Sequence, residues 1–341
     1  MVMMEAVRIF LEAGHDIEMI SMADGELRND VKALGIPVSL RKEFMEDWKS
    51  FLYYAWSFDL VLVNTIVPLQ TIHLLNQTHI KTIWWIHEPQ VYFDVYKEWL
   101  PDMSKLNPNI HLWAVSPVVA DTINDNYGIR PPIVPFGIYD AYKGETLIKA
   151  TNTVTFLTVG IFCKRKGQDL ILKAADAIGP LTDVSVEFLF CGNTKDVEPD
   201  IYEPIKRAAQ ASSGPDSVDI KTLPETDHTH MLEIIAEADY LLIPSRAEPM
   251  PTVAAEGLMM GTPSIISDIC GMSKYIKDRK HGFVFESENI DDMIRAIKEA
   301  IKLRHPGSEE YRKMVSAGRQ LYIENFSCKH FRDELLNVLE G

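Results

Sequence analysis

The stretch PSRAEPMPTVAAEGLMMGTP, from Pro244 to Pro263, places two carboxylates around the start of a predicted helix. Apolar, strand-like runs lie directly before it, at 240–243, and directly after it, at 264–267. Glu248 therefore falls in the loop after a buried strand, and Glu256 falls on the helix that follows. In open α/β sheets, ligands bind at this carboxyl end of the strands.

The start of this helix has the chemistry to hold a nucleotide-sugar. A proline at 251 suits a helix start, so the amides of Thr252 and Val253 are free to face a docked phosphate. A carboxylate such as Glu256 accepts hydrogen bonds from ribose or sugar hydroxyls. An isolated pair of glutamates at this spacing is better explained as a loop cap and a solvated helix residue. The Pro-Ser strand end and the Gly-x-Pro strand start around this pair favour a functional role.

The pattern resembles the Glu-x7-Glu signature of the retaining GT-B glycosyltransferases of the group 1 family, glycosyltransferase family 4. The resemblance extends over essentially the whole chain. It implies two Rossmann-like domains whose parallel sheets face a cleft, and sugar transfer from a nucleotide diphosphate with retention and without a metal ion. It assigns Glu248 to the donor sugar, as a catalytic residue, and Glu256 to the ribose.

Length and composition exclude several other classes of protein. A chain of 341 residues fits two domains better than one, and a net charge of −15 argues against nucleic acid as a partner. No apolar run approaches the roughly 20 residues that cross a bilayer. The four cysteines are far apart and show no metal spacing, as in a cytoplasmic protein with reduced thiols. No Asp-x-Asp pair is present, which argues against the metal-dependent class of glycosyltransferases.

Strand-like and helical segments alternate along the chain, which predicts parallel sheets covered by helices. The first domain is expected over 1–138, a linker over 139–152, and a nucleotide-sugar-binding domain over 153–325. The resemblance implies that the last helix, 326–341, crosses back to the first domain. The predicted strands are 17–21, 60–64, 82–87, 112–116 and 133–135 in the first domain, and 153–159, 187–191, 218–222, 240–243, 264–267 and 282–285 in the second.

The chain opens in a helix, at 3–13, where a Rossmann-like domain normally opens with a strand and a Gly-rich turn. Gly14 and His15 match the Gly-His pair that ends this helix in family members. The first domain is therefore expected to lack its first strand, through a late assigned start, trimming or a degenerate gene. We expect a gap or a substitute strand near 17–21 and 60–64, and weak or absent transferase activity of this chain.

The stretch VGIFCKRKGQDLILKA, from Val159 to Ala174, resembles the strand-loop-helix element of the family that binds the donor diphosphate. Gly160 allows the backbone to turn at the strand end, and Lys166 places a cation beside the free amides of a helix start. The family often has an arginine after this glycine, where this chain has Ile161. Arg165 is the better candidate for the second charge, because it can bind a phosphate bidentately. The alternative is a solvated basic turn.

Two further positions belong to the donor site that the resemblance implies. Gly192 follows a strand and would keep the next loop out of the base pocket, although an ordinary turn glycine explains it nearly as well. Leu223 precedes a helix in the loop that closes over the base in family members. His228 and His230 begin that helix. Because no third ligand is nearby in the sequence, we interpret them as surface residues and not as a metal pair.

In the first half of the chain, the segment WWIHE at 84–88 ends a predicted strand. Family members have a histidine here that approaches the donor sugar, so the resemblance assigns His87 to a sugar oxygen as a catalytic residue. The alternative is a structural histidine. Glu88 is a candidate for acceptor hydroxyls or a cation, and Asn64, at the previous strand end, is a candidate for the acceptor side.

These features predict a glycosyltransferase that needs no cofactor, uses a nucleotide-sugar as co-substrate, and has a glycan or a lipid-linked glycan as acceptor. We expect a bacterial protein of polysaccharide biosynthesis in the cytoplasm, with contact at the inner face of the membrane left open. One alternative is a non-catalytic or degenerate glycosyltransferase-like module, which the missing strand and Ile161 favour. The other is a GT-B nucleotide-sugar epimerase.

Overall fold

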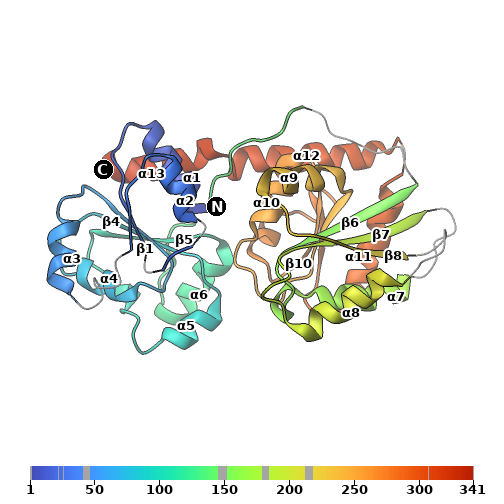
Figure 1. Cartoon of the computed structure of the whole chain (residues 1–341), viewed down its shortest axis with the longest axis horizontal. Coiled ribbons are helices and arrows are strands. Elements are labelled where there is room, and N and C mark those ends of the chain that lie inside the picture. Colours follow the sequence, from blue (N-terminus) through green and yellow to red (C-terminus); the bar gives the residue numbers. More distant parts are fainter. Residues whose placement is uncertain are drawn as a thin grey trace. The chain divides into compact units, whose positions relative to one another are not determined.

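The computed structural model describes residues 2–21, 23–25, 27–40, 47–144, 152–178, 184–211, 218–305 and 307–340. The chain forms two compact units (Figure 1). The first unit comprises Met1–Tyr139 and Phe326–Gly341, and the second comprises Asp140–Asn325. All the strand ladders in the described residues are parallel, which confirms the predicted α/β class with parallel sheets.

A six-stranded sheet forms the centre of the second unit, with the strand order β11-β10-β9-β6-β7-β8. The order reverses between β6 and β9, and doubly wound sheets bind their ligands at such a switch point. Since β6 and β9 are neighbours, the loops that follow them meet at one edge of the sheet. The strands are β6 (Thr153–Val159), β7 (Ser185–Cys191), β8 (Val218–Leu223), β9 (Tyr240–Ile243), β10 (Ser264–Ser267) and β11 (Gly282–Phe285).

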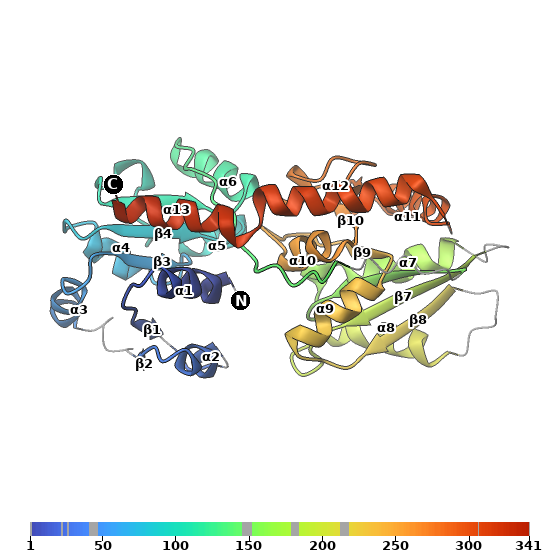
Figure 2. The ribbon, with the colours of Figure 1, turned by 90° about the horizontal axis from the view of Figure 1, so that it is seen from above.

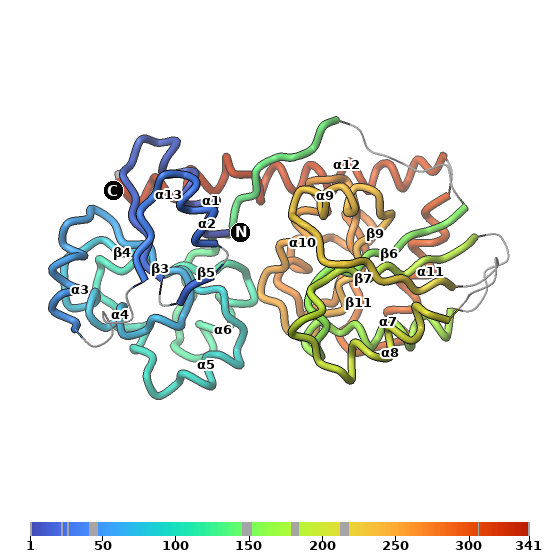
Figure 3. The backbone as a smooth tube through the Cα atoms, viewed as in Figure 1, coloured from blue at the N-terminus to red at the C-terminus, as the bar shows by residue number. Residues whose placement is uncertain are grey.

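Two layers of helices cover this sheet (Figures 1 and 3). In the hydrophobic core of this unit, the ring of Phe156 stacks between those of Phe188 and Tyr240. Its centroid lies 5.3 Å from that of Phe188 and 5.7 Å from that of Tyr240. One layer consists of α7 (Gln168–Ile178), α8 (Pro199–Gln210) and α11 (Ile290–Leu303), and the other of α9 (His228–Glu237), α10 (Thr252–Met260) and α12 (Glu309–Asn325).

The sheet of the first unit is divided. The strands β3 (Val61–Asn64), β4 (Thr82–Ile86) and β5 (Ile110–Ala114) form one sheet, and β1 (Met19–Ser21) pairs separately with β2 (Val38–Leu40). Within the described residues no ladder joins β1 to β3, so the expected gap is present between them. Each of these two strands leaves one edge without a ladder in that part of the chain, and such edges expose backbone hydrogen-bonding groups. Strand β2 was not predicted.

The last helix, α13 (Cys328–Glu340), packs in the first unit beside α1 (Val2–Glu12) (Figure 2). Lys81 donates hydrogen bonds from Nζ to the carbonyls of Val338 and Leu339, at 2.8 and 3.3 Å, and a cation there stabilises a helix C-terminus. The other helices of this unit are α2 (Leu27–Ala33), α3 (Trp48–Ala55), α4 (Leu69–Leu75), α5 (Gln90–Tyr96) and α6 (Pro117–Tyr127).

One predicted strand is wrong, and part of the predicted linker cannot be compared. Residues 133–135 form no strand, and Ile133 makes only an isolated bridge with Ala114. The prolines at 131, 132 and 135 explain this, because proline has no N–H to donate to a ladder. Of the predicted linker at 139–152, residues 145–151 lie outside the described residues.

Candidate functional site

The switch point of the second unit brings two loops into contact. The loop after β6 contains a short 3-10 turn, Lys164–Lys166, which we call the basic turn. The backbone N–H of Arg246, in the loop after β9, donates to the carbonyl of Arg165 at 2.7 Å. Gly167 ends the basic turn with φ 72°, and a Cβ there would lie 2.0 Å from the carbonyl oxygen of Pro244. Only glycine fits this approach of the two backbones.

Three predicted site residues meet between these loops. One carboxylate oxygen of Glu248, Oε2, accepts hydrogen bonds from Arg165 and from Lys166, each at 2.6 Å. The side chains of Glu248 and Lys166 are 15% and 17% exposed, while that of Arg165 is 44% exposed. We call these three residues the anion cluster. Its two cations outnumber its one carboxylate, so it has the charge to hold a further anion.

Two predicted glycines lie at this edge of the sheet, and the backbone geometry explains why glycine is present at each position. Gly160 has φ 139°, and a Cβ there would come within 3.4 Å of Cε of Lys166, whose side chain runs past it. At Gly192 a Cβ would lie 2.1 Å from the carbonyl oxygen of Gly160, so the close approach of two backbones requires this glycine. Leu223 is the last residue of β8, in register with Cys191 of β7, and it is half-buried.

The start of α10 lies at the same sheet edge, after β9. Pro251 precedes the helix and gives no side-chain cap, so the amides of Thr252 and Val253 lack acceptors within the helix. One turn further on, Glu256 is only 3% exposed. Its Oε1 lies 2.8 Å from Nε2 of His228.

His228, which we interpreted from the sequence as a surface residue, contacts one of the predicted site residues. Its side chain is 48% exposed, but its ring contacts the buried carboxylate of Glu256. The available signal was its position: it begins the helix that follows β8, so it lies at the same sheet edge as the start of α10. His230 instead faces Glu233 of its own helix, and both side chains are more than half exposed.

In the first unit, two predicted residues lie at the ends of neighbouring strands and carry unpaired polar atoms: Asn64 is the last residue of β3, and His87 directly follows β4. Oδ1 of Asn64 and Nε2 of His87 are buried and have no hydrogen-bond partner among the described residues. Burial lowers the pKa of His87 from 6.5 to about 3, so its imidazole is neutral at physiological pH. The ring packs against Trp85 with centroids 4.4 Å apart. Buried polar groups are nearly always paired, so these two unpaired atoms keep both residues as candidates for ligand contact.

Glu88 ties together the loops that follow β3 and β4. Its Oε2 accepts from the backbone N–H groups of His87, at 3.0 Å, and of Ile66, at 3.2 Å, and its Oε1 accepts from the hydroxyl of Thr65. Burial raises the pKa of Glu88, while these hydrogen bonds oppose that rise. Thr65 has φ 110°, a strained value for a β-branched residue. These contacts account for the burial of Glu88 without a ligand.

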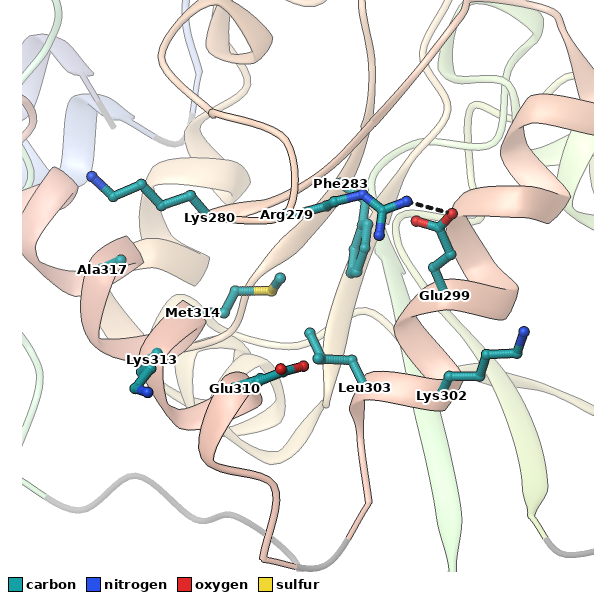
Figure 4. A pocket seen from close by; sticks show the side chains of 10 residues that line it. All are labelled: Arg279, Lys280, Phe283, Glu299, Lys302, Leu303, Glu310, Lys313, Met314 and Ala317. Carbon is teal, nitrogen blue, oxygen red and sulfur yellow. Dashed lines mark hydrogen bonds and ion pairs between the residues drawn. The ribbon is translucent and has the colours of Figure 1, made fainter.

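A separate pocket of about 640 Å³ lies in the second unit (Figure 4). Phe283, near the start of β11, and the last turn of α11 contribute to it, so it is at the opposite sheet edge from the anion cluster. Two of its cations already have partners: Arg279 contacts Glu299 at 2.7 Å, and Lys313 contacts Glu309 at 2.8 Å. None of the predicted site residues lines this pocket.

Neither a metal-binding cluster nor a membrane-spanning helix is present in the described part of the chain. No group of three or more His, Cys, Asp or Glu side chains there is arranged to hold a metal ion. Among the helices described, none is long and apolar enough to cross a membrane.

Two family models match the chain. The model described as glycosyl transferases group 1 matches residues 144–321, and the model described as glycosyl-transferase family 4 matches residues 1–116. An uncharacterized glycosyltransferase from Methanocaldococcus jannaschii is 24% identical over 213 residues, which cover 62% of this chain and 54% of the relative. The alpha-maltose-1-phosphate synthase of Mycolicibacterium smegmatis is 24% identical over 186 residues, 53% of this chain and 46% of the relative. The chain thus spans about half the length of these curated relatives.

Solved structures match almost the whole chain. A glycosyltransferase from Rickettsia africae has a TM-score of 0.79 at 16% identity and covers 99% of this chain and 93% of its own. The Anabaena protein HepE, in complex with UDP-glucose, has a TM-score of 0.76 at 13% identity and covers 99% and 95%. At these identities the likeness shows the fold, which is GT-B with two Rossmann-like units.

Proposed function

Since this chain belongs to the group 1 family of glycosyl transferases, we propose that it transfers a sugar from a nucleotide diphosphate to a glycan or lipid-linked acceptor. The proposal includes retention at the anomeric carbon and no requirement for a metal ion. It places the reaction in the cytoplasm, with peripheral contact to the membrane where the acceptor is lipid-linked.

The anion cluster carries this proposal. Two cations converge on a single oxygen of Glu248, which lies in the loop that leads into the first turn of α10. A diphosphate offers several oxygens of the same kind, and it would be stabilised by both the cations and the helix dipole. The site also lies at the switch point of the sheet, where the topology places ligands.

The other predicted residues of the second unit receive roles around this diphosphate. Lys166 and Arg165 bind its phosphates, with the amides of Thr252 and Val253 nearby. Glu256 accepts hydrogen bonds from the ribose hydroxyls, and its burial makes such bonds strong because little water competes for them. Gly160, Gly192 and Leu223 line the nucleotide, and Glu248 contacts the donor sugar.

For the residues of the first unit, the buried unpaired atoms support roles in sugar binding. A neutral His87 can donate from Nε2 to a sugar oxygen, provided that its other ring nitrogen carries no proton. Asn64 can accept from an acceptor hydroxyl through Oδ1. Glu88 supports both residues by fixing the loops on which they lie, and it is also a candidate for acceptor contact.

Retention requires the new bond to form on the same face of the sugar from which the phosphate leaves. The acceptor oxygen attacks the anomeric carbon as the bond to the phosphate oxygen breaks, and the acceptor proton passes to that phosphate oxygen. The nucleoside diphosphate leaves with one additional negative charge before this proton arrives. In this proposal Lys166 and Arg165, which converge on one oxygen of Glu248, stabilise that charge, which is the role a metal ion has in other transferases.

Calorimetry with UDP, GDP and ADP tests the nucleotide site. We expect one of them to bind, and Lys166→Ala to weaken the diphosphate far more than the matching nucleoside, since the proposed partner of Lys166 is a phosphate. EDTA should leave binding unchanged. Loss of binding in EDTA, together with normal binding by Lys166→Ala, would contradict the metal-free phosphate site.

Product analysis separates the proposal from its alternatives. A transferase releases the nucleoside diphosphate and extends an acceptor, whereas an epimerase releases free nucleotide or an altered sugar without any acceptor. A non-catalytic module binds the nucleotide and turns nothing over. The divided sheet of the first unit is the observation that favours this last alternative.

A further inference from the structure

Arg246 joins the basic turn to the loop after β9 through its side chain. Its Nη1 donates to the carbonyl of Lys164 at 2.6 Å. Nη1 and Nη2 donate to the two carboxylate oxygens of Asp169 at 2.8 and 3.0 Å, and Nε donates to Glu288 at 2.8 Å. Four of the five N–H groups of the guanidinium therefore have acceptors, and the side chain is only 15% exposed.

Asp169, whose carboxylate accepts from both Nη1 and Nη2 of Arg246, lies in the first turn of α7, directly beyond the basic turn. It also accepts from Nζ of Lys164 at 2.9 Å. Burial raises the pKa of Asp169, but the hydrogen bonds from Arg246 and Lys164 outweigh that effect and hold the pKa below its ordinary value. Asp169 is thus an ionised partner on which the planar guanidinium is bidentate.

These contacts hold the first two residues of the basic turn. Arg246 binds the carbonyl of Lys164 with its side chain and the carbonyl of Arg165 with its backbone N–H, so two successive peptide groups are held against the loop after β9. Arg165 returns a hydrogen bond to the carbonyl of Ala247 at 3.0 Å. The direction in which Arg165 and Lys166 leave the backbone is fixed by this frame.

We propose that Arg246 is a positioning residue for diphosphate binding: it fixes the basic turn so that Arg165 and Lys166 converge on one anion. This rests on the proposed function, in which those two cations bind the donor phosphates. The side-chain N–H groups of Arg246 donate to acceptors in the protein, whereas Arg165 and Lys166 bind the phosphate. Fixing the turn in advance removes the entropic cost of ordering it when the ligand binds.

The proposal predicts that diphosphate binding depends on the planar shape of the side chain at position 246, and not on its charge alone. Lysine keeps the positive charge but has no planar fork, so Arg246→Lys cannot bind both oxygens of Asp169 and the carbonyl of Lys164 together. Arg246→Lys and Arg246→Gln should therefore weaken the nucleoside diphosphate to a similar extent, by about tenfold or more, the usual effect of removing a charged hydrogen-bonding group. Affinity for the matching nucleoside should stay within about twofold.

Arg295 offers a matched control within the same unit. Its Nε, Nη1 and Nη2 also bind protein acceptors, which are Asp292, Glu299 and the carbonyl of Val284. Arg295→Gln removes the same charge and a similar set of hydrogen bonds, so it should leave both affinities unchanged. Calorimetry for the diphosphate and ligand-observed NMR for the nucleoside measure the four proteins at one salt concentration.

Hydrogen exchange tests the positioning without any ligand. The amides of Lys166 and Gly167 donate to the carbonyls of Cys163 and Lys164, at 3.0 and 3.2 Å, and these bonds close the basic turn. In Arg246→Gln, but not in Arg295→Gln, both amides should exchange at least about tenfold faster, because their protection depends on the local opening free energy.

The outcomes of these experiments test the positioning role of Arg246 separately from the proposed function. Normal diphosphate affinity in Arg246→Lys, equal weakening of diphosphate and nucleoside, or unchanged exchange at Lys166 and Gly167 would each overturn the positioning role. If UDP, GDP and ADP all fail to bind the wild-type protein, the proposed function fails. The exchange experiment then still decides whether Arg246 holds the turn.

Discussion

The imidazole Nε2 of His228 lies 2.8 Å from the carboxylate Oε1 of Glu256. The two residues are on different helices, α9 and α10, so their hydrogen bond fixes the rotation of a carboxylate whose side chain is only 4% exposed. The proposed function assigns this carboxylate to the ribose. The contact therefore links a half-exposed histidine to nucleotide affinity.

His228→Ala should weaken nucleoside diphosphate binding by about 0.5–1.5 kcal/mol, the net contribution of one hydrogen bond. The reason is that the unpaired Glu256 carboxylate then rotates among several orientations. His230→Ala is the control, since His230 lies on the same helix but faces the exposed Glu233. Calorimetry on both variants measures the difference, and equal affinities for the two would show that the contact has no part in binding.

Glu248→Gln should bind the nucleoside diphosphate more tightly than the wild-type protein. The Glu248 carboxylate accepts hydrogen bonds from both of the cations proposed to bind the diphosphate, so it competes with the phosphate for them. Removing this competing charge should add roughly 1 kcal/mol of binding free energy, a value typical of a partly exposed ion pair. Sugar transfer should fall by about a hundredfold or more, as when a group that contacts the reacting centre is removed.

Glu309→Gln is the matched control for this charge change. It removes one carboxylate from an exposed pair with Lys313 at the start of α12, so it should alter neither UDP affinity nor turnover. Weaker UDP binding by Glu248→Gln would contradict competition between this carboxylate and the phosphate.

Much of the second unit could be predicted from the sequence because its signals are local. The strands at 153–159, 240–243, 264–267 and 282–285 have the predicted bounds, and the helix predicted after Pro251 spans Thr252–Met260. Each strand is an apolar run bounded by turn residues, and the helix begins after a proline and ends at a glycine.

Short elements of the first unit were not predicted. Strand β2 has only three residues, fewer than a period-2 pattern needs to be recognised. Helix α5 has seven residues, and Pro89 before it makes no side-chain cap, so it carries no start signal. Helix α3 does carry one, because Asp47 accepts from the amide of Ser50 at 3.2 Å, but the sequence interpretation did not use it.

The side-chain pairs of the candidate site depend on the order of strands in the sheet. Arg246 and Asp169 are 77 residues apart, and they meet because β9 lies next to β6. His228 and Glu256 meet because α9 packs on α10. Local patterns identify such residues as polar and near strand ends, but the partner of each follows only from the three-dimensional arrangement.

Acid should destabilise the first unit through His87. Burial lowers the pKa of this histidine from 6.5 to about 3, so between these values the unfolded chain binds a proton that the folded chain does not. The free energy of unfolding therefore falls as the pH decreases from about 6.5 toward 3. His87→Gln should remove on the order of 2 kcal/mol of the loss between pH 6.5 and 4.5. All six tryptophans lie between residues 48 and 113, so tryptophan fluorescence reports this unit alone.

The control for this measurement is His79→Gln. His79 is exposed, in the segment between α4 and β4, and its replacement should leave the pH dependence of the fluorescence transition as it is in the wild-type protein. If His87→Gln loses stability in acid as steeply as the wild-type protein does, the acid sensitivity comes from other groups.

A buried ion pair should govern the stability of the second unit. Nε of Arg304 donates to Oδ1 of Asp239, and these side chains are 0% and 4% exposed. Asp239 also accepts from the backbone N–H of Thr155 at 2.9 Å, and its own carbonyl accepts from the hydroxyl of Tyr311 at 2.7 Å. Asp239→Asn removes the carboxylate of this buried ion pair, so unfolding should become easier by about 3–5 kcal/mol. Urea unfolding followed by far-UV circular dichroism measures this change, with Glu309→Gln, which breaks an exposed pair, expected to shift stability by less than about 0.5 kcal/mol. Equal midpoints for the two variants would show that the buried pair contributes no more than an exposed one.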